Sequence, residues 1–138
     1  MSAAVDISEN TKNIHKLTSL VIQQLGPGSG INFGLNAESV KWVEGYIERI
    51  RRPGLDEKTL QGLVNTLGAF LGECLVANTP GVWAWSEQQE TIGILFPGGG
   101  YAFPFNKVRK QLVDGREAGD SIAGFFDVVL GFQAAGKL

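Results

Sequence analysis

The sequence is poor in the residues that most often carry chemistry. Its 138 residues include one cysteine, Cys74, one histidine, His15, and one methionine. A single cysteine excludes an intramolecular disulfide, and one histidine with one cysteine matches none of the common zinc-ligand spacings. There is also no Asp-rich calcium loop and no phosphate-binding glycine motif. We therefore expect no metal, no cofactor and no catalytic residue of a familiar kind.

A large excess of charge of either sign is also absent. Twelve Lys and Arg residues against fourteen Asp and Glu residues give a net charge of -2 and a pI of about 5.4. Such a balance gives no field that would attract nucleic acid or a membrane surface. The basic residues that do cluster, in 49–52 and 107–116, are expected on solvated helix faces, with a local anion or acidic-partner patch as the alternative.

Long hydrophobic runs are missing as well. No apolar stretch approaches the roughly 20 residues that a membrane-spanning helix needs. The first ten residues are polar and lack the basic and apolar regions of a signal peptide. With its single cysteine, the chain fits a reducing compartment. We expect a cytoplasmic protein with no membrane partner.

The first half of the chain predicts three helices. Asn36 and Asp56 are good N-caps for the second and the third. The glycine-rich stretch 26–30 is expected to end the first helix and to form a flexible hinge. Apolar residues recur at helical spacing in three segments, 10–25, 37–52 and 57–78.

The second half changes to the period of two that is typical of strands. Asn106 is expected to cap a short helix that ends at Val113, and Asp120 to cap a last helix over 121–130. The predicted fold is α+β, with helices packed on a small antiparallel meander in the order α-α-α-β-β-β-α-α. The three predicted strands are 82–86, 91–96 and 101–105.

The domain organisation is simple. A chain of this length can bury its own core without disulfides or metal. We expect the segment 57–78 to be the central helix, because its apolar face is the widest. The predicted parts are an N-terminal helix and glycine-rich hinge over 1–35, a single α+β domain over 36–131, and a mobile tail over 132–138.

Two glycines, Gly68 and Gly72, lie in this predicted central helix. Each costs a helix about 1 kcal/mol relative to alanine, so we expect another helix or the sheet to pack closely against them. Glu73 follows among apolar neighbours. Burial would suit it to acid–base chemistry, but a structural partner such as an arginine or a backbone amide is the commoner role of a buried carboxylate.

Aromatic residues alternate along two of the predicted strands. Trp83 and Trp85 should share one sheet face, and Tyr101, Phe103 and Phe105 should share a face of the third strand. One row is expected to form core, whereas the other, if it is open, would bind a partner. The strands carry no basic residue, so stacking on nucleic acid is not expected.

The predicted start of the fourth helix is the best local candidate for binding. Free backbone N–H groups there, together with Lys107, could hold an anion or a carboxylate of a partner. The alternative is a capping Asn106 and a solvated lysine. In chain order, the candidate binding residues are Glu73, Trp83, Trp85, Tyr101, Phe105, Asn106, Lys107 and Arg109.

Two motifs carry a resemblance to a known family. The pattern Leu-Gly-x-x-Leu-Gly-Glu at 67–73 and the pattern Phe-Pro-Phe-Asn-Lys at 103–107 resemble a family of small bacterial domains without an established activity, and the similarity spans about 36–129. In size and in lack of catalytic apparatus, members are similar to the stand-alone immunity-type proteins that neutralise bacterial toxins by binding them. The resemblance therefore implies a partner-binding role.

Three functions remain open from the sequence. The leading hypothesis is a non-enzymatic protein-binding module, a cytoplasmic antitoxin or immunity-type inhibitor whose partner is another protein such as a toxin. The second is a small-molecule-binding protein or hydrolase, which requires Glu73, Asn106 and Lys107 to converge on one pocket. The third is a structural accessory module of a larger assembly. The sequence does not indicate the oligomeric state.

Overall fold

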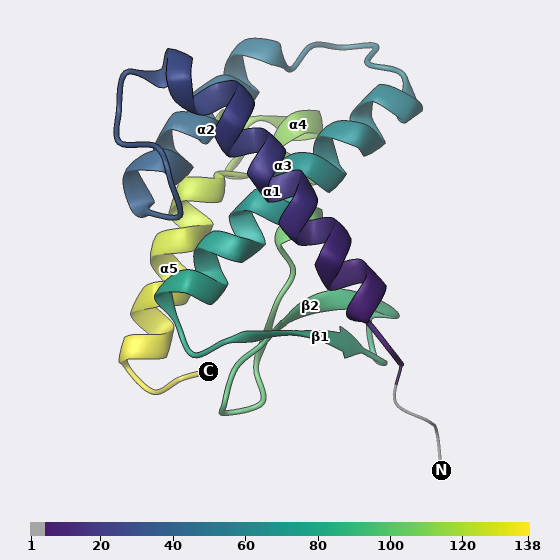
Figure 1. Ribbon diagram of the computed structural model, residues 1–138, viewed down its shortest axis with the longest axis vertical. Helices are drawn as coiled ribbons and strands as arrows, with labels where there is room; N and C mark the ends of the chain where they lie inside the picture. The colour runs from purple at the N-terminus through teal and green to yellow at the C-terminus, as the bar shows by residue number, and fades with distance from the viewer. Residues whose placement is uncertain (1–4) are drawn as a thin grey trace.

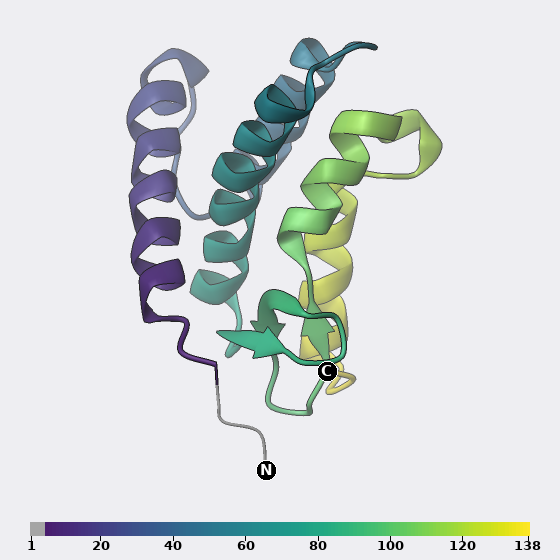
Figure 2. The ribbon, with the colours of Figure 1, turned by 90° about the vertical axis from the view of Figure 1, so that its right-hand side faces the viewer.

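The computed structural model describes residues 5–138 and confirms the predicted α+β order within them. These residues form five α-helices and a three-stranded sheet. Figure 1 shows their arrangement, and Figure 2 shows the sheet at one end of the helices. In chain order the elements are α1 (Ser8–Ser29), α2 (Ala37–Ile50), α3 (Glu57–Asn78), β1 (Val82–Ser86), β2 (Thr91–Leu95), β3 (Tyr101–Ala102), α4 (Pro104–Asp114), the 3-10 helix η1 (Arg116–Ala118) and α5 (Ile122–Ala134).

The helix α3 is the centre of the fold. Figure 2 shows it between α1 on one side and the α4–α5 pair on the other. Every residue from Leu67 to Leu75 is buried, because helices and strands cover α3 on all sides. By length and composition, α3 is apolar enough to cross a membrane, contrary to the expectation that no run qualifies. Its burial inside the fold accounts for that composition.

The sheet is an antiparallel meander in the order β1-β2-β3. Its register pairs Trp83 with Ile94 and Trp85 with Ile92, while Leu95 lies between Val82 and Tyr101. Directly opposite residues of antiparallel strands share a face. The two tryptophans therefore lie on one face of the sheet, and Val82 and Tyr101 lie on the other.

The predicted N-caps of α2 and α3 are confirmed. The side chain of Asn36 accepts a hydrogen bond from the backbone N–H of Ser39, at 2.9 Å. Asp56 does the same for Thr59, at 2.8 Å. This backbone hydrogen bond, with a second from the Thr59 hydroxyl, lowers the pKa of the exposed Asp56 carboxyl below its ordinary value.

The prediction that the first helix ends before a glycine-rich hinge is wrong. Helix α1 continues through Pro27 to Ser29 and ends at Gly30, whose φ of 74° is left-handed. Pro27 lies in the last turn and has no N–H to donate to the carbonyl four residues before it, so α1 continues through the proline with one backbone hydrogen bond fewer. The Ser29 hydroxyl donates to the carbonyl of Gly26 at 2.7 Å and so satisfies one of the terminal acceptors.

Two predicted helix starts are also wrong. Strand β3 stops at Ala102, and α4 begins at Pro104, which takes a first-turn position, so Asn106 lies inside the helix and does not cap it. Ser121, and not Asp120, caps α5 by accepting from the Gly124 N–H at 2.9 Å. Helix α5 runs past the predicted end at 130 and includes 132–134, which were expected in a mobile tail.

Candidate functional site

The glycines of α3 form notches that aromatic rings fill. A Cβ placed on Gly68 would clash with the ring of Phe105 and lie 3.0 Å from the Cα of that residue. A Cβ on Gly72 would clash with the indole of Trp83 and lie 3.1 Å from Cγ of Pro104. The two rings also meet, with centroids 5.8 Å apart. The close approach expected at these glycines is therefore made by β1 and the start of α4.

Glu73 connects three elements of the fold. The residue is only 9% exposed. One carboxylate oxygen accepts a hydrogen bond from Nε1 of Trp83 at 3.3 Å, and the other lies 3.0 Å from Nε2 of His15. A buried carboxylate needs such partners, because burial removes its hydration. The partners are a histidine on α1 and a tryptophan on β1, instead of the expected arginine or backbone amide.

The His15–Glu73 pair resembles a histidine base that is oriented by a carboxylate, but no nucleophile within residues 5–138 lies beside it. Nucleophilic catalysis needs a hydroxyl or thiol within hydrogen-bond reach of the base. In residues 5–138, His15 has Glu73 as its only polar side-chain partner. Cys74 is fully buried, and burial, followed by the charge of Glu73, raises the pKa of its thiol to about 12. At neutral pH the thiol is therefore protonated and unreactive.

The structure gives the three polar candidates on α4 separate neighbours. Asn106 is exposed to solvent. The ammonium of Lys107 lies 5.8 Å from the ring centroid of Phe125 on α5. Arg109 turns to the start of α3, where it pairs with Glu57 at 2.9 Å and donates to the side chain of Gln61. Glu73, in contrast, is engaged with α1 and β1.

The sheet separates the aromatic candidates into two groups. Trp83 faces α3, where it fills the Gly72 notch. Tyr101 and Phe103 stack on the opposite face, with centroids 5.6 Å apart, and the Tyr101 hydroxyl donates to the backbone carbonyl of Trp85 at 3.0 Å. Phe105 belongs to α4 and packs on Gly68, so the expectation that it continues the Tyr101 row is wrong.

We call the second of these faces the outer sheet face and define it by Val82, Leu95, Tyr101 and Phe103. Val82 is 55% exposed, although it is a strand valine. Phe103 lies flat over Gly93, because a Cβ there would be 2.8 Å from its ring. The face is therefore apolar, and its two stacked rings are held in place by strand β2 beneath them.

A hollow of about 290 Å³ opens on the other side, between α1, α3, β2 and α4. Its polar wall is built mainly from amides, and one of these, Gln61, donates to Asn65 Oδ1 at 2.7 Å. Trp85 is paired with Ile92, one of the lining residues, and so lies on the same face of the sheet as that residue. No charged side chain lines it; the lining residues are Asn10, Asn13, Ile14, Leu17, Gln61, Asn65, Thr91, Ile92 and Phe105.

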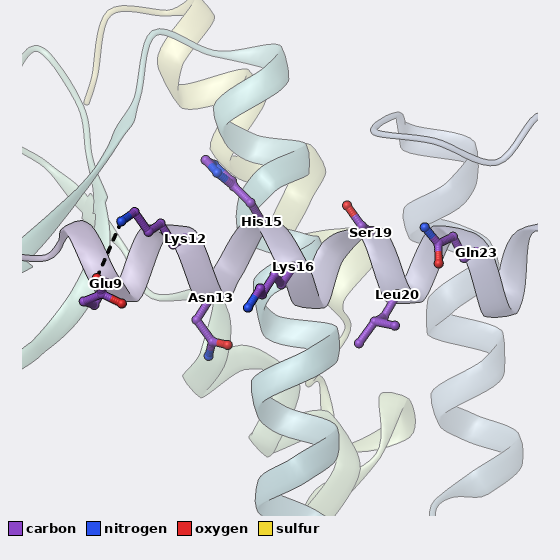
Figure 3. Close-up of a pocket in the computed structure, with 8 residues that line it drawn as sticks. All are labelled: Glu9, Lys12, Asn13, His15, Lys16, Ser19, Leu20 and Gln23. Atoms are coloured by element: carbon purple, nitrogen blue, oxygen red, sulfur yellow. Dashed lines mark ion pairs between the residues drawn. The ribbon is translucent and has the colours of Figure 1, made fainter.

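A wider and shallower depression follows the outside of α1. Figure 3 shows that its side chains all project from this single helix, and they include the Glu9–Lys12 ion pair at 3.6 Å. His15 stands at its edge with a side chain that is 64% exposed. A depression with residues of one helix around it has no opposing wall, so it cannot enclose a substrate.

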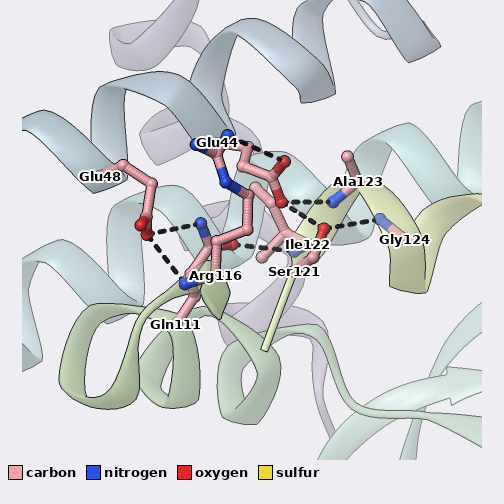
Figure 4. A network of polar contacts seen from close by, with 8 residues as sticks. All are labelled: Glu44, Glu48, Gln111, Arg116, Ser121, Ile122, Ala123 and Gly124. Atoms are coloured by element: carbon pink, nitrogen blue, oxygen red, sulfur yellow. Dashed lines mark hydrogen bonds and ion pairs between the residues drawn. The ribbon is translucent and has the colours of Figure 1, made fainter. Parts of the chain in front are cut away.

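The sequence analysis missed a buried polar network that joins α2 to the C-terminal part of the chain. Figure 4 shows Glu44 accepting hydrogen bonds from the Ser121 hydroxyl and the Ala123 N–H, with Arg116 at 3.8 Å. Its lower half centres on the fully buried Gln111, which donates to Glu48 at 3.0 Å and accepts from the N–H of Ile122 at 2.8 Å.

This network has a structural role, because it joins α2 to the start of α5. The Ser121 hydroxyl is at once the cap of α5 and a donor to Glu44, so the groups satisfy one another and leave no nucleophile free. One signal in the sequence could have indicated it. Glu44 and Glu48 lie one turn apart on α2 beside the apolar stripe of Val43 and Ile47, where a solvated carboxylate is not expected.

Comparisons add no family to this description. In the part of the chain that the structure describes, no group of three or more His, Cys, Asp or Glu side chains could hold a metal ion. The resemblance to small bacterial domains stays a prediction. No protein-family model, curated protein or solved structure matches this chain.

Proposed function

We propose that this chain is a non-enzymatic protein-binding domain that inhibits a partner protein by covering its functional surface. The outer sheet face is the observation that carries the proposal. It presents an exposed valine and two stacked aromatic rings on a rigid sheet. Aromatic side chains of this kind supply most of the binding energy in protein interfaces.

The geometry of this face suits tight binding. Tyr101 and Phe103 are already fixed against each other and against β2, so a partner would order few side chains on binding. The hydrogen bond from Tyr101 to the Trp85 carbonyl restrains the first ring further. Strand β1 is at the edge of the sheet, which allows a partner to extend the contact along Val82 to Ser86.

The polar groups of the fold also support a non-enzymatic, protein-binding role. Glu73, Glu44 and Arg109, which could act chemically if they were free, are each engaged in contacts between elements. The one thiol is buried and protonated. We therefore assign the inhibitor role of an antitoxin or immunity protein, acting in the cytoplasm by direct contact with a toxin.

Co-expression with a toxin-like protein encoded next to this chain tests the proposal. Val82 and Val113 provide a matched pair, because both valines are 55% exposed and they lie on different surfaces. The wild type and Val113→Lys should form a 1:1 complex and rescue growth. Val82→Lys should weaken binding at least about tenfold, which corresponds to about 1.4 kcal/mol. Absence of rescue by the wild type would overturn the proposal.

The hollow between α1, α3, β2 and α4 favours a second candidate function, the binding of a small uncharged ligand. Its amides offer both donors and acceptors, and the ring of Phe105 supplies an apolar surface. Titration with neutral sugars, followed by NMR shifts of the Asn10, Asn13 and Asn65 side-chain amides, tests it. Shifts confined to these groups would support the candidate, and their absence across the series would count against it.

A further inference from the structure

A hollow of about 270 Å³ lies between the loop that follows α2 and the end of α4. Figure 2 shows both segments at the end of the helices that lies opposite the sheet. The residues that line the hollow are Arg51, Arg52, Pro53, Gly54, Leu55, Leu60, Leu112 and Val113. Its walls are therefore mainly apolar, and the two arginines are the only charged residues among those that line it.

Both arginines come from the basic segment 49–52, for which the sequence leaves two roles open, a solvated helix face and a local anion site. Arg49 has the first role, because it is exposed on α2 and its guanidinium lies 5.4 Å from the ring centroid of Trp42. Arg51 and Arg52 follow the end of α2 and line the hollow. The structure therefore separates these two arginines from the solvated face.

Arg51 is held in place at the wall of the hollow. Its Nη2 donates to the backbone carbonyl of Val113 at 3.0 Å, and a Cβ on Gly115 would lie 2.8 Å from its Cζ. Its Nε is buried and has no hydrogen-bond partner within residues 5–138. Folded proteins seldom leave a buried donor unpaired, and a partly buried charge without a counter-charge costs free energy. An anion in the hollow would offset that cost.

The fold itself supplies no such anion. Within the part of the chain that the structure describes, neither arginine forms an ion pair with a carboxylate. Asp56, which follows the loop, is occupied as the cap of α3, and Asp114 pairs with neither arginine. The backbone N–H groups of Gly54 and Leu55 also donate no hydrogen bond in this part of the chain. Two positive charges and several unused donors therefore surround the hollow.

We propose that this hollow binds a small organic anion, an oxyanion group carried on an apolar body. The oxyanion contacts the guanidinium groups of Arg51 and Arg52, whose planar forks of N–H donors match the oxygens of a carboxylate or a phosphate. The apolar body packs on the buried side chains of Leu60 and Leu112. Ligand sites commonly combine a mainly apolar lining with a few placed polar groups, and about 270 Å³ is at the small end of their range.

The site is independent of the proposed inhibitor function. The hollow and the outer sheet face lie at opposite ends of the helices (Figure 2), so a ligand in the hollow leaves that face open. A carboxylate and a phosphate monoester share the chemistry that the two arginines recognise, and the binding experiment distinguishes them.

NMR titration of the full ¹⁵N-labelled chain at pH 7 and constant ionic strength is the first test. The probes are benzoate and phenyl phosphate, with benzyl alcohol as the ring without a charge and inorganic phosphate as the charge without a ring. At least one aromatic anion should shift the Gly54 and Leu55 amides and the Arg51 Nε–H saturably, with a Kd of about 1 mM or below. Both controls should bind at least about tenfold more weakly. The tighter of the two anions identifies the oxyanion group. Absence of saturation by both anions, or equal binding of benzyl alcohol, would overturn the proposal.

Substitutions of the arginines test the assigned contacts. Arg52→Gln should weaken binding of the aromatic anion about three- to tenfold, and the fold should be unaffected because this side chain is exposed and unpaired within residues 5–138. Arg49→Gln is the matched control, since it removes the same charge from the same segment outside the hollow, and it should leave the Kd unchanged. Arg51→Lys keeps the charge but loses the planar fork, so it should also weaken binding, with circular dichroism to check the fold. Equal affinities for Arg52→Gln and Arg49→Gln would indicate general attraction of anions to positive charge and would contradict the proposal.

Discussion

Replacing Gly72 by alanine should destabilise this protein, although alanine is the better helix former. The intrinsic gain in α3 is about 1 kcal/mol. The new Cβ, however, would occupy the position of the Trp83 indole and lie 3.1 Å from Pro104. Overpacking of this kind typically costs about 1–3 kcal/mol.

The indole cannot move without a second loss. Its Nε1 donates to the buried carboxylate of Glu73 at 3.3 Å, and breaking a hydrogen bond to a buried charged group costs about 1–3 kcal/mol. The net loss should be about 1–5 kcal/mol, depending on how far the indole is displaced. For a chain of this size, that lowers Tm by roughly 3–17 °C.

Gly62 on the same helix is the matched control for this experiment. A Cβ there would meet no atom within 4 Å, so Gly62→Ala should gain up to about 1 kcal/mol. Urea unfolding followed by circular dichroism and tryptophan fluorescence measures both variants. The reasoning fails if Gly72→Ala is as stable as the wild type or more stable.

Three further predictions concern buried groups. Glu73→Ala leaves Trp83 without its acceptor and should lose about 1–3 kcal/mol of unfolding free energy in urea titrations; an unchanged midpoint would contradict the assigned contact. Cys74 should resist Ellman's reagent at pH 8 in the folded protein and react once guanidinium unfolds it, since the pKa of its thiol is raised to about 12. Gly115→Ala should lose about 1–3 kcal/mol, because φ is 88° and a Cβ would lie 2.8 Å from the Arg51 guanidinium. If the Tm of that variant equals the Tm of the wild type, the inferred strain at position 115 is refuted.

Local signals in the sequence were enough for much of the fold. The N-caps Asn36 and Asp56, the extent of α3 and the limits of β1 follow from side chains within a few residues of each boundary. The glycines at 68 and 72 correctly indicated close packing on α3, because a helix seldom keeps such residues without a neighbour against them.

The features that the sequence did not predict depend on contacts between segments that are far apart in the chain. The glycine-rich end of α1 stays helical where Phe33 packs beside Gly26, and nothing in the stretch 26–30 itself indicates that contact. Glu73 finds its partner in His15, far away in the sequence, and spacing rules reach only about one helical turn. The Glu44 network joins three separate segments, so each residue alone resembles an ordinary surface or capping position.

Isothermal titration of the co-expressed toxin partner with the wild type, Val82→Lys and Val113→Lys measures the central claim most directly. The outer sheet face predicts a wild-type complex of 1:1 stoichiometry, a Kd raised at least about tenfold by the change at 82, and an unchanged Kd for the equally exposed valine at 113. Equal affinities for all three proteins would contradict the claim that this face is the binding surface.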